Sequence, residues 1–346
     1  MTIFDLVRAP EIASYWNEMA EQRAPYLGEE LFPNQKKLGL TLSWLKGSSG
    51  LPVALKLSAF DAKAVPRPRI GVSKVTADMP FFKESMYIDE ELRQELNKVL
   101  ESGNMNYIDA IVNRIFDDEK TLLEAAAVSR ERMRMMLITT GSVTLASNGQ
   151  SYDYDYGIAE SQKKTVTTSW STDTSDIIGD IRTWQDEIED ATGVRPTRAI
   201  CDRATWGYIL KNKAIIKSIY ALSDGTTYLS TPKLRDYLME ELELEVVVYS
   251  KKYKNESGVS TPYVPADTFV LLPPGTLGNT WFGTTPEESD LMASSTVENV
   301  SVVDTGVAVT TMKQADPVNV ETKITQICLP DFPVADQIII ADVSAN

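Results

Sequence analysis

The longest periodic pattern in the chain predicts a helix over residues 107–139, which ends before Gly141. At about 1.5 Å of rise per residue such a helix is about 50 Å long. Its apolar positions lie on one face, namely Ile108, Ile111, Val112, Ile115, Phe116, Leu122, Ala126, Met133, Met136 and Leu137. Its charged positions lie on the opposite face, namely Asp109, Arg114, Asp117, Asp118, Lys120 and Glu131. We therefore expect one-sided burial and a helix long enough to support several strands.

The pattern before this helix predicts an arm followed by an extended segment. Residues 9–20 carry apolar side chains at helical spacing after Pro10, which predicts a short amphipathic helix. From residue 40 onward apolar and polar side chains alternate, which is typical of β-strands. Two prolines within residues 65–69 exclude a helix there. A shorter helix capped by Asp89 is predicted to precede the long one.

The pattern after the long helix predicts a hairpin and then a mixed α/β region. Residues 143–158 alternate around Asn148-Gly149, which is a strong signal for a two-residue hairpin turn. Residues 159–172 are polar and predict a loop or a surface strand. From Asp173 onward helices and strands alternate, with helices predicted near 177–193, 206–216 and 231–239 and strands near 198–201, 246–249 and 269–272. A charged hairpin is predicted over 251–263.

The last part of the chain predicts β-structure again. A hairpin is expected across residues 304–306, an alternating strand over 318–325 and a short strand at 338–340. Because these strands follow an inserted α/β region, we expect them to complete the lobe that contains the long helix. The resulting fold class is α+β.

The charge distribution argues against a protein that grips nucleic acid. The net charge is −15 and the isoelectric point is near 4.6, whereas neutralising phosphates requires a basic surface. Residues 51–78 are an exception, because they hold five basic residues against two acids. This segment is either a solvated hairpin or an arm that docks on an acidic neighbouring subunit. Long loops outside compact domains are usually functional or disordered.

The residue types available for chemistry are few. The chain has no histidine, which excludes Ser-His-Asp and Cys-His catalysis and HExxH zinc sites. It also lacks a GxxxxGK[ST] phosphate loop and a GxGxxG motif. The remaining candidates for acid-dependent hydrolysis, which needs two carboxyl groups about 5–9 Å apart, are Asp153, Asp155, Asp186, Glu187, Glu189 and Asp190. We expect these acids to form solvated faces, and we expect no catalytic site and no cofactor.

The cysteines, the acid pair on the predicted hairpin and the absence of membrane signals bear on disulfides, metal binding and cellular location. Cys201 and Cys328 lie far apart, so a disulfide is open but two reduced, buried thiols are the simpler expectation. Asp153 and Asp155 alternate on one side of a predicted strand without further ligands nearby, so we expect no metal there. No apolar run approaches the roughly 20 residues of a membrane span, and the first residues are acidic where a signal peptide is basic. We expect an intracellular, soluble product.

Several short motifs, in their order along the chain, resemble the major head proteins of lambda-like tailed phages. They are the hairpin at 141–157, Thr168-Ser169-Trp170-Ser171, Cys201-Asp202-Arg203-Ala204-Thr205-Trp206, Tyr263-Val264-Pro265-Ala266-Asp267-Thr268, and Gly278-Asn279-Thr280-Trp281-Phe282-Gly283 before Thr285-Pro286-Glu287. The resemblance covers nearly the whole chain. It implies a Hong Kong 97-like capsid fold and a structural protein of an icosahedral phage head that encloses double-stranded DNA.

The resemblance also implies a division of the chain and a set of partners. The expected parts are an N-terminal arm at 1–38, an extended loop with flanking strands at 39–80, a peripheral lobe with the spine helix and hairpin at 81–172, an axial lobe at 173–298, and C-terminal strands returning to the peripheral lobe at 299–346. The expected partners are copies of the chain in pentamers and hexamers, a portal, possible decoration proteins and a separate scaffolding protein, since no long helical leader is present. Assembly in the host cytoplasm and residence in the virion follow, with no membrane partner.

The residues that we expect at contacts between subunits lie on the arm and on the extended loop. They are Trp16, Phe60, Lys63, Arg67 and Arg69. Two other hypotheses stay open at this point, namely a cellular nanocompartment shell of the same fold and a carboxylate-dependent hydrolase.

Overall fold

A computed structural model describes residues 8–20, 24–46, 73–88, 105–220, 227–293, 299–315 and 318–345, together with a few helical positions between 90 and 98. The described chain divides into two compact units. The first comprises Met1–Leu42, Thr76–Met133 and Asn279–Asp331, and the second comprises Ser43–Val75, Arg134–Gly278 and Phe332–Asn346. The extended loop expected within residues 39–80 lies mostly outside the described residues, as does most of the helix predicted after Asp89.

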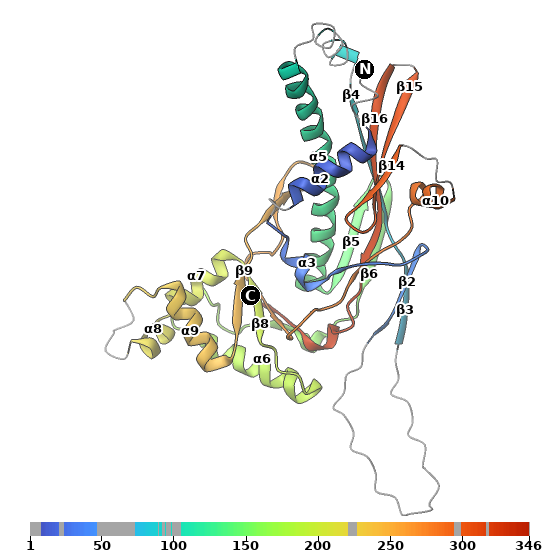
Figure 1. Cartoon of the computed structure of the whole chain (residues 1–346). Helices are drawn as coiled ribbons and strands as arrows, with labels where there is room; N and C mark the ends of the chain where they lie inside the picture. Colours follow the sequence, from blue (N-terminus) through green and yellow to red (C-terminus); the bar gives the residue numbers. More distant parts are fainter. Residues whose placement is uncertain are drawn as a thin grey trace, which may run out of the picture. The chain divides into compact units, whose positions relative to one another are not determined.

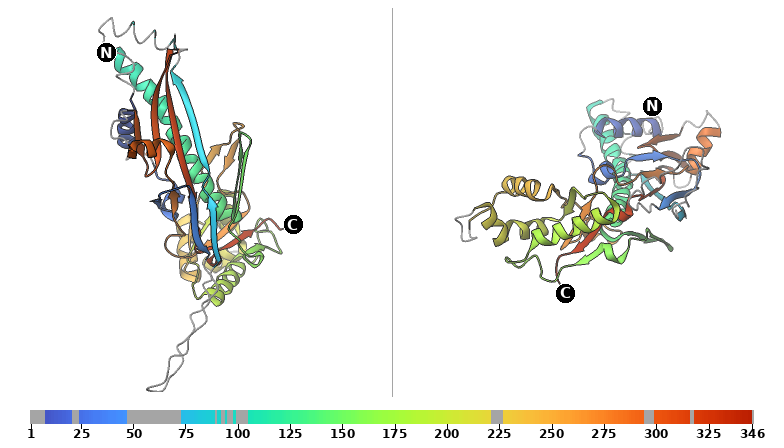
Figure 2. Two further views of the ribbon diagram at one scale, coloured as in Figure 1. Left: turned by 90° about the vertical axis from the view of Figure 1, so that its right-hand side faces the viewer. Right: turned by 90° about the horizontal axis from the view of Figure 1, so that it is seen from below.

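The first unit is built on a six-stranded sheet whose central strand is β16 (Val318–Pro330). This strand pairs antiparallel with three others along its length, as Figure 2 shows for the long strands. The other strands are β1 (Asn34–Lys36), β4 (Phe81–Ile88), β13 (Thr280–Phe282), β14 (Val300–Val303) and β15 (Val307–Ala315). The helices are α2 (Ala9–Ala20), α3 (Leu27–Leu31), α10 (Pro286–Ala293) and much of α5 (Met105–Thr140).

The long helix α5 confirms the predicted spine, because it runs continuously over 36 residues. Its burial differs from the expected one-sided pattern, however. Glu131 was predicted on the exposed face, but it is fully buried, as are Arg130 and Arg134. The carboxylate of Glu131 accepts a hydrogen bond from the backbone N–H of Gly28 at 3.1 Å, so α3 covers the face that the charge pattern assigned to solvent.

The arm helix α2 also matches its prediction, and it packs against β14 and β15. Ile12 and Trp16, one helical turn apart, are both buried. Figure 1 shows α2 lying across α5, and the hydroxyl of Tyr15 donates to Asp117 of α5 at 2.8 Å while its ring stacks on Phe116. The arm therefore obtains a large part of its burial from its own chain.

The second unit is an α/β layer around a five-stranded sheet in the order β7-β17-β12-β8-β9. The strands are β7 (Lys163–Thr165), β8 (Arg198–Cys201), β9 (Glu245–Val248), β12 (Thr268–Leu272) and β17 (Ile339–Asp342). The helices are α6 (Ile177–Thr192), α7 (Arg203–Lys211), α8 (Lys213–Ile219) and α9 (Thr231–Leu242). All four helices share one apolar core with alternate strand residues, so they cover one face of the sheet.

Local capping explains where these helices begin. The carboxylates of Asp176 and Asp202 accept backbone N–H groups at the starts of α6 and α7, and the Asn212 side chain does the same for α8. Helix α6 ends at Gly193, which adopts the left-handed conformation that the sequence indicated. These polar residues fix the positions at which the three helices begin.

The sheet pairing adds three facts about the segments of the expected division. Strand β17 joins β12 in the second unit, which also contains the last turns of α5 from Arg134 onward. Strand β7 pairs with β17, so part of the segment 159–172 belongs to the second unit's sheet, and Trp170 within it is fully buried. Strand β13 pairs with β1 and β16 of the first unit, although the expected axial lobe extended to residue 298.

The short hairpins and connections complete the described structure. Strands β5 (Ser142–Ser147) and β6 (Gln150–Asp155) turn at Asn148-Gly149 as predicted, and β10 (Lys252–Lys254) pairs with β11 (Ser260–Pro262). Strands β2 (Thr41–Lys46) and β3 (Ser73–Asp78) form a third two-stranded sheet. Two 3-10 turns, η1 (Glu160–Gln162) and η2 (Ala335–Gln337), are joined by the side-chain amide of Gln162.

Candidate functional site

A buried polar cluster in the first unit joins four elements. The guanidinium of Arg130 on α5 donates to Asp304 at 2.8 Å and to Gln326 of β16 at 2.9 Å. The other carboxylate oxygen of Asp304 accepts the indole N–H of Trp16 at 3.0 Å. The Gln326 amide in turn donates to the carbonyl of Ala126 at 3.1 Å. The cluster therefore holds α2, the β14–β15 turn and β16 to α5.

The turn that presents Asp304 has an unusual backbone. Asp304 and Thr305 both have positive φ, at 46° and 75°. Gly306 follows, and a Cβ there would lie 2.7 Å from the side chain of Phe282. The ring of Phe282 also faces the Arg130 guanidinium at 5.6 Å. The tight turn is thus built to bring a carboxylate against a buried arginine, where breaking a buried ion pair costs about 3–5 kcal/mol.

Trp16 is the one predicted contact residue that lies in the described part of the chain. It is 2% exposed and takes part in the cluster just described. Its side chain is therefore buried within its own subunit, which weighs against a contact with a neighbouring copy. The other four predicted contact residues, Phe60, Lys63, Arg67 and Arg69, lie outside the described residues, so their role stays a prediction.

Two ion pairs attach α10 to the first unit's sheet. Lys323 of β16 lies 2.6 Å from Glu287, and Lys36 of β1 lies 2.5 Å from Glu288. Partial burial by itself would raise the pKa of Glu287, but hydrogen bonds from Lys323 and Thr325 outweigh it and hold that pKa below its ordinary value. The sequence pattern did not reveal these pairs, because the partners are far apart along the chain.

Five of the six carboxylates considered for hydrolysis take part in local ion pairs or hydrogen bonds. Asp186 and Glu189 both pair with Arg195, at 2.8 and 2.6 Å, and Glu187 pairs with Lys164. On the β5–β6 hairpin, Asp153 accepts from the Thr144 hydroxyl and Asp155 accepts from the Gly157 N–H. Within the described part of the chain, no group of three or more Cys, Asp or Glu side chains is arranged to hold a metal ion.

Two acids that the sequence reading did not single out are partly or largely buried. Burial raises the pKa of Asp180, which accepts the indole N–H of Trp170 at 2.9 Å. Burial likewise raises the pKa of Asp331, which accepts the indole N–H of Trp281 at 2.8 Å. Each carboxylate accepts the indole N–H of a tryptophan that packs at the edge of a core, so both acids have structural roles.

The two cysteines are buried thiols that form no disulfide. Cys201 and Cys328 are both free, and burial raises the pKa of the Cys201 thiol above its ordinary value. A buried thiol of raised pKa is a poor nucleophile. Among the described helices, none combines the length and the apolar character that a bilayer crossing requires.

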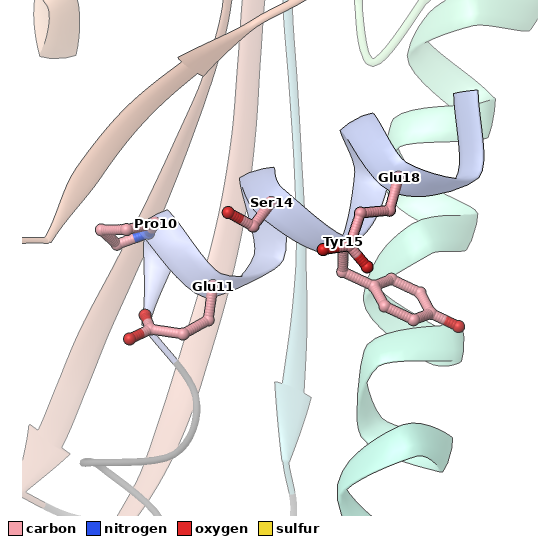
Figure 3. A pocket seen from close by; sticks show the side chains of 5 residues that line it. All are labelled: Pro10, Glu11, Ser14, Tyr15 and Glu18. Atoms are coloured by element: carbon pink, nitrogen blue, oxygen red, sulfur yellow. The ribbon is translucent and has the colours of Figure 1, made fainter. Parts of the chain in front are cut away.

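An open depression lies along the outer surface of α2. Its lining comes from this helix alone, and Figure 3 shows the side chains of Pro10, Glu11, Ser14, Tyr15 and Glu18 on successive turns. No other described element contributes groups that converge on it. A binding site is ordinarily concave with polar groups from several elements, so this depression does not have the form of one.

Comparison with known proteins gives one family and one fold. A family model described as phage major capsid protein E matches residues 9–343. No curated protein matches the chain.

Solved structures of similar fold cover almost the full length. A structure assigned as the capsid protein of an Escherichia coli CFT073 prophage is 15% identical, with 98% of this chain and 99% of that chain covered and a TM-score of 0.62. A phage-related protein from Bordetella bronchiseptica is 12% identical, with 98% of each chain covered and a TM-score of 0.56. The capsid of cyanophage A-1(L) is 10% identical, with 92% of each chain covered and a TM-score of 0.51. At these identities the likeness concerns the fold, which is the Hong Kong 97-like capsid fold.

Proposed function

Because the chain belongs to the phage major capsid protein E family, we propose that its copies assemble as pentamers and hexamers into the closed head shell of a tailed phage. The chain is a structural protein of that shell and a virion component. The observation that carries the proposal is that the family match extends from residue 9 to residue 343 and so spans both compact units. Pentamers and hexamers are the closed rings from which an icosahedral shell is made.

The segment 51–78 is proposed to provide a contact between neighbouring copies. It holds five basic residues against two acids in a chain of net charge −15. Whole subunits of this charge repel one another at long range, so a local basic segment gives the contact both attraction and direction. Phe60, Lys63, Arg67 and Arg69 are the residues that we propose to lie against the next subunit.

Reversing two charges of this segment tests the contact. Arg67→Glu combined with Arg69→Glu should abolish shells while leaving the subunit folded, because like charges brought together across an interface are strongly unfavourable. Electron microscopy and sedimentation would measure assembly, and circular dichroism would measure folding. The matched control reverses Lys211 and Lys217, two exposed lysines of α7 and α8. Normal shells from the Arg67, Arg69 variant would contradict the proposed contact.

The remaining partners are proposed from the requirements of a phage head. A scaffolding protein encoded separately, a portal and decoration proteins would complete the particle, and assembly would take place in the host cytoplasm. The acidic character of the chain supports enclosure of DNA without sequence-specific binding, since tight packing of phosphates requires an inner face that does not grip them. Expression of the chain with and without a candidate scaffolding protein tests whether it assembles and whether assembly needs a scaffold. A chain that stays monomeric at high concentration in both conditions would contradict the proposed function.

A further inference from the structure

The five-stranded sheet of the second unit has an open edge at β9. This strand pairs with β8 on one side, and the sheet order ends there within the described residues (Figure 1). The N–H groups of Glu245 and Tyr249 donate to carbonyls on the β8 side. Because a parallel ladder alternates with a period of two residues, the N–H and C=O groups of Val246 and Val248 point away from β8. They are available to another strand.

A groove lies along this edge. It has a volume of about 210 Å³, and its lining comes from α9 and β9, namely Arg235, Met239, Leu244, Glu245, Val246, Val247 and Val248. Met239 is 48% exposed, which is high for a large apolar side chain beside a strand. Exposed, apolar strand edges promote pairing with other chains, and native proteins ordinarily cover or blunt them. The edge is therefore suited to accept an extended segment.

The chain beside the groove is rich in acids, although Arg235 is among the lining residues. Exposed glutamates follow one another from the end of α9 into β9, at Glu240, Glu241, Glu243 and Glu245. Glu241 pairs with Arg182 at 3.3 Å. A second strand that carries basic side chains and has its own unpaired edge would complement the glutamates in charge. It would also complement the outward N–H and C=O groups of β9 in hydrogen bonding.

The same unit carries such a segment in the hairpin that follows β9. In this hairpin Asn255 and Tyr263 donate their N–H groups to the opposite strand, so the backbone groups of Lys252 and Lys254 point outward. Both lysine side chains are exposed. On the other strand Pro262 has no N–H, which leaves β10 as the edge able to form a full ladder. Tyr253 packs on Tyr263 at 4.9 Å, and Tyr263 packs on Tyr249 beside β9 at 5.9 Å, so these rings link the hairpin to its own unit.

We propose that the β9 edge of one copy pairs with the β10 edge of a second copy, so that neighbouring second units are joined head to tail by a shared sheet. This rests on the proposed assembly into rings, and it deepens that function by naming the two surfaces. A contact between two different patches of identical subunits is the kind that closes into rings. Each subunit offers one acidic edge and one basic edge, so every copy in a ring can satisfy both.

Charge exchange between the two edges provides the first test. Glu243→Lys with Glu245→Lys, and separately Lys252→Glu with Lys254→Glu, should each lower the assembled fraction by about tenfold or more. The chain carrying all four changes should recover most of that loss, because the charges again oppose one another. Shells that form normally from either double variant, or a fourfold variant that fails to recover, would overturn the pairing. Circular dichroism confirms that each chain is folded.

A backbone substitution and a crosslink provide the second test. Val248→Pro removes an N–H that faces away from β8, so the subunit should fold while assembly is lost; Val247→Pro removes a bond to β8 and should unfold the sheet. If Val248→Pro does not fold, mixed shells should form disulfide-linked dimers under oxidation. The cysteine pair would be Glu245→Cys with Lys252→Cys if the two strands run parallel, and Val248→Cys with Lys252→Cys if they run antiparallel. Shells without such dimers would overturn the pairing and leave the shell function intact. A wild-type chain that never assembles would overturn both.

Discussion

Replacing Asp304 by asparagine tests whether the buried polar cluster supports the first unit. The two carboxylate oxygens of Asp304 accept hydrogen bonds from two donors, the Trp16 indole and the Arg130 guanidinium. Asparagine keeps the size of the side chain and tolerates the positive φ of 46° at this position. Its amide nitrogen must face one of the two donors, however, so one hydrogen bond becomes a contact between two donors.

The expected loss of stability follows from the burial of the partners. Removing one partner of a buried ion pair costs about 3–5 kcal/mol. The Arg130 side chain is fully buried, whereas that of Asp304 is 19% exposed, and Gln326 still accepts from Arg130. These facts favour the lower end of the range, about 3 kcal/mol. For a unit of this size that is roughly 6–12 °C in the midpoint of thermal unfolding.

Thermal and urea unfolding of the unassembled subunit would measure this loss. The matched control is Asp290→Asn, an exposed aspartate on α10, which should change the stability by less than about 0.5 kcal/mol. Adding Trp16→Phe removes one of the competing donors, so the double variant should lose less than the sum of the two single losses. A loss for Asp304→Asn no larger than that of the control would refute the reasoning, and strict additivity would show that the two side chains do not share the carboxylate.

Two further predictions concern pH and backbone geometry. The pKa of Glu287 is held below its ordinary value of 4.5, so its ionised form stabilises the fold above that pH and the contribution is lost as the pH falls below it. Glu287→Gln should therefore be less stable than wild type at pH 7, and its free energy of unfolding should fall less steeply as the pH is lowered. Urea unfolding at several pH values measures this, and the same pH dependence for both proteins would contradict it. Gly141 has a φ of 78°, and an added Cβ would lie 2.7 Å from the Ile158 side chain, so Gly141→Ala should lose at least about 1–2 kcal/mol from the backbone term alone. Ile158→Val removes the Cδ1 atom at 2.7 Å but leaves Cγ1 at 3.0 Å and Cβ at 3.2 Å, so it should recover only a fraction of the steric loss. Full recovery in thermal unfolding would argue against the backbone term.

The elements that the sequence predicted well are those set by neighbours along the chain. The spine helix, the turn at Asn148-Gly149 and the α6 helix that ends at Gly193 all follow from helical period, turn residues and caps. These signals act within a few residues and need no knowledge of the rest of the fold. The short motifs, taken in their order along the chain, also sufficed to suggest the family, because that order matches the order of elements in the capsid fold.

The features that the sequence left undecided depend on which segments meet. An alternating strand records which of its faces is buried but not which strand pairs with it, so the membership of β7, β13 and β17 came only from the structure. The burial of Arg130 and Glu131 has the same cause, because their partners are brought to α5 from Asp304 and Gly28, far away along the chain. Helical and strand periodicity is determined by residues that are neighbours in sequence, whereas a sheet partner or a buried counter-charge is determined only by the long-range contacts of the folded chain.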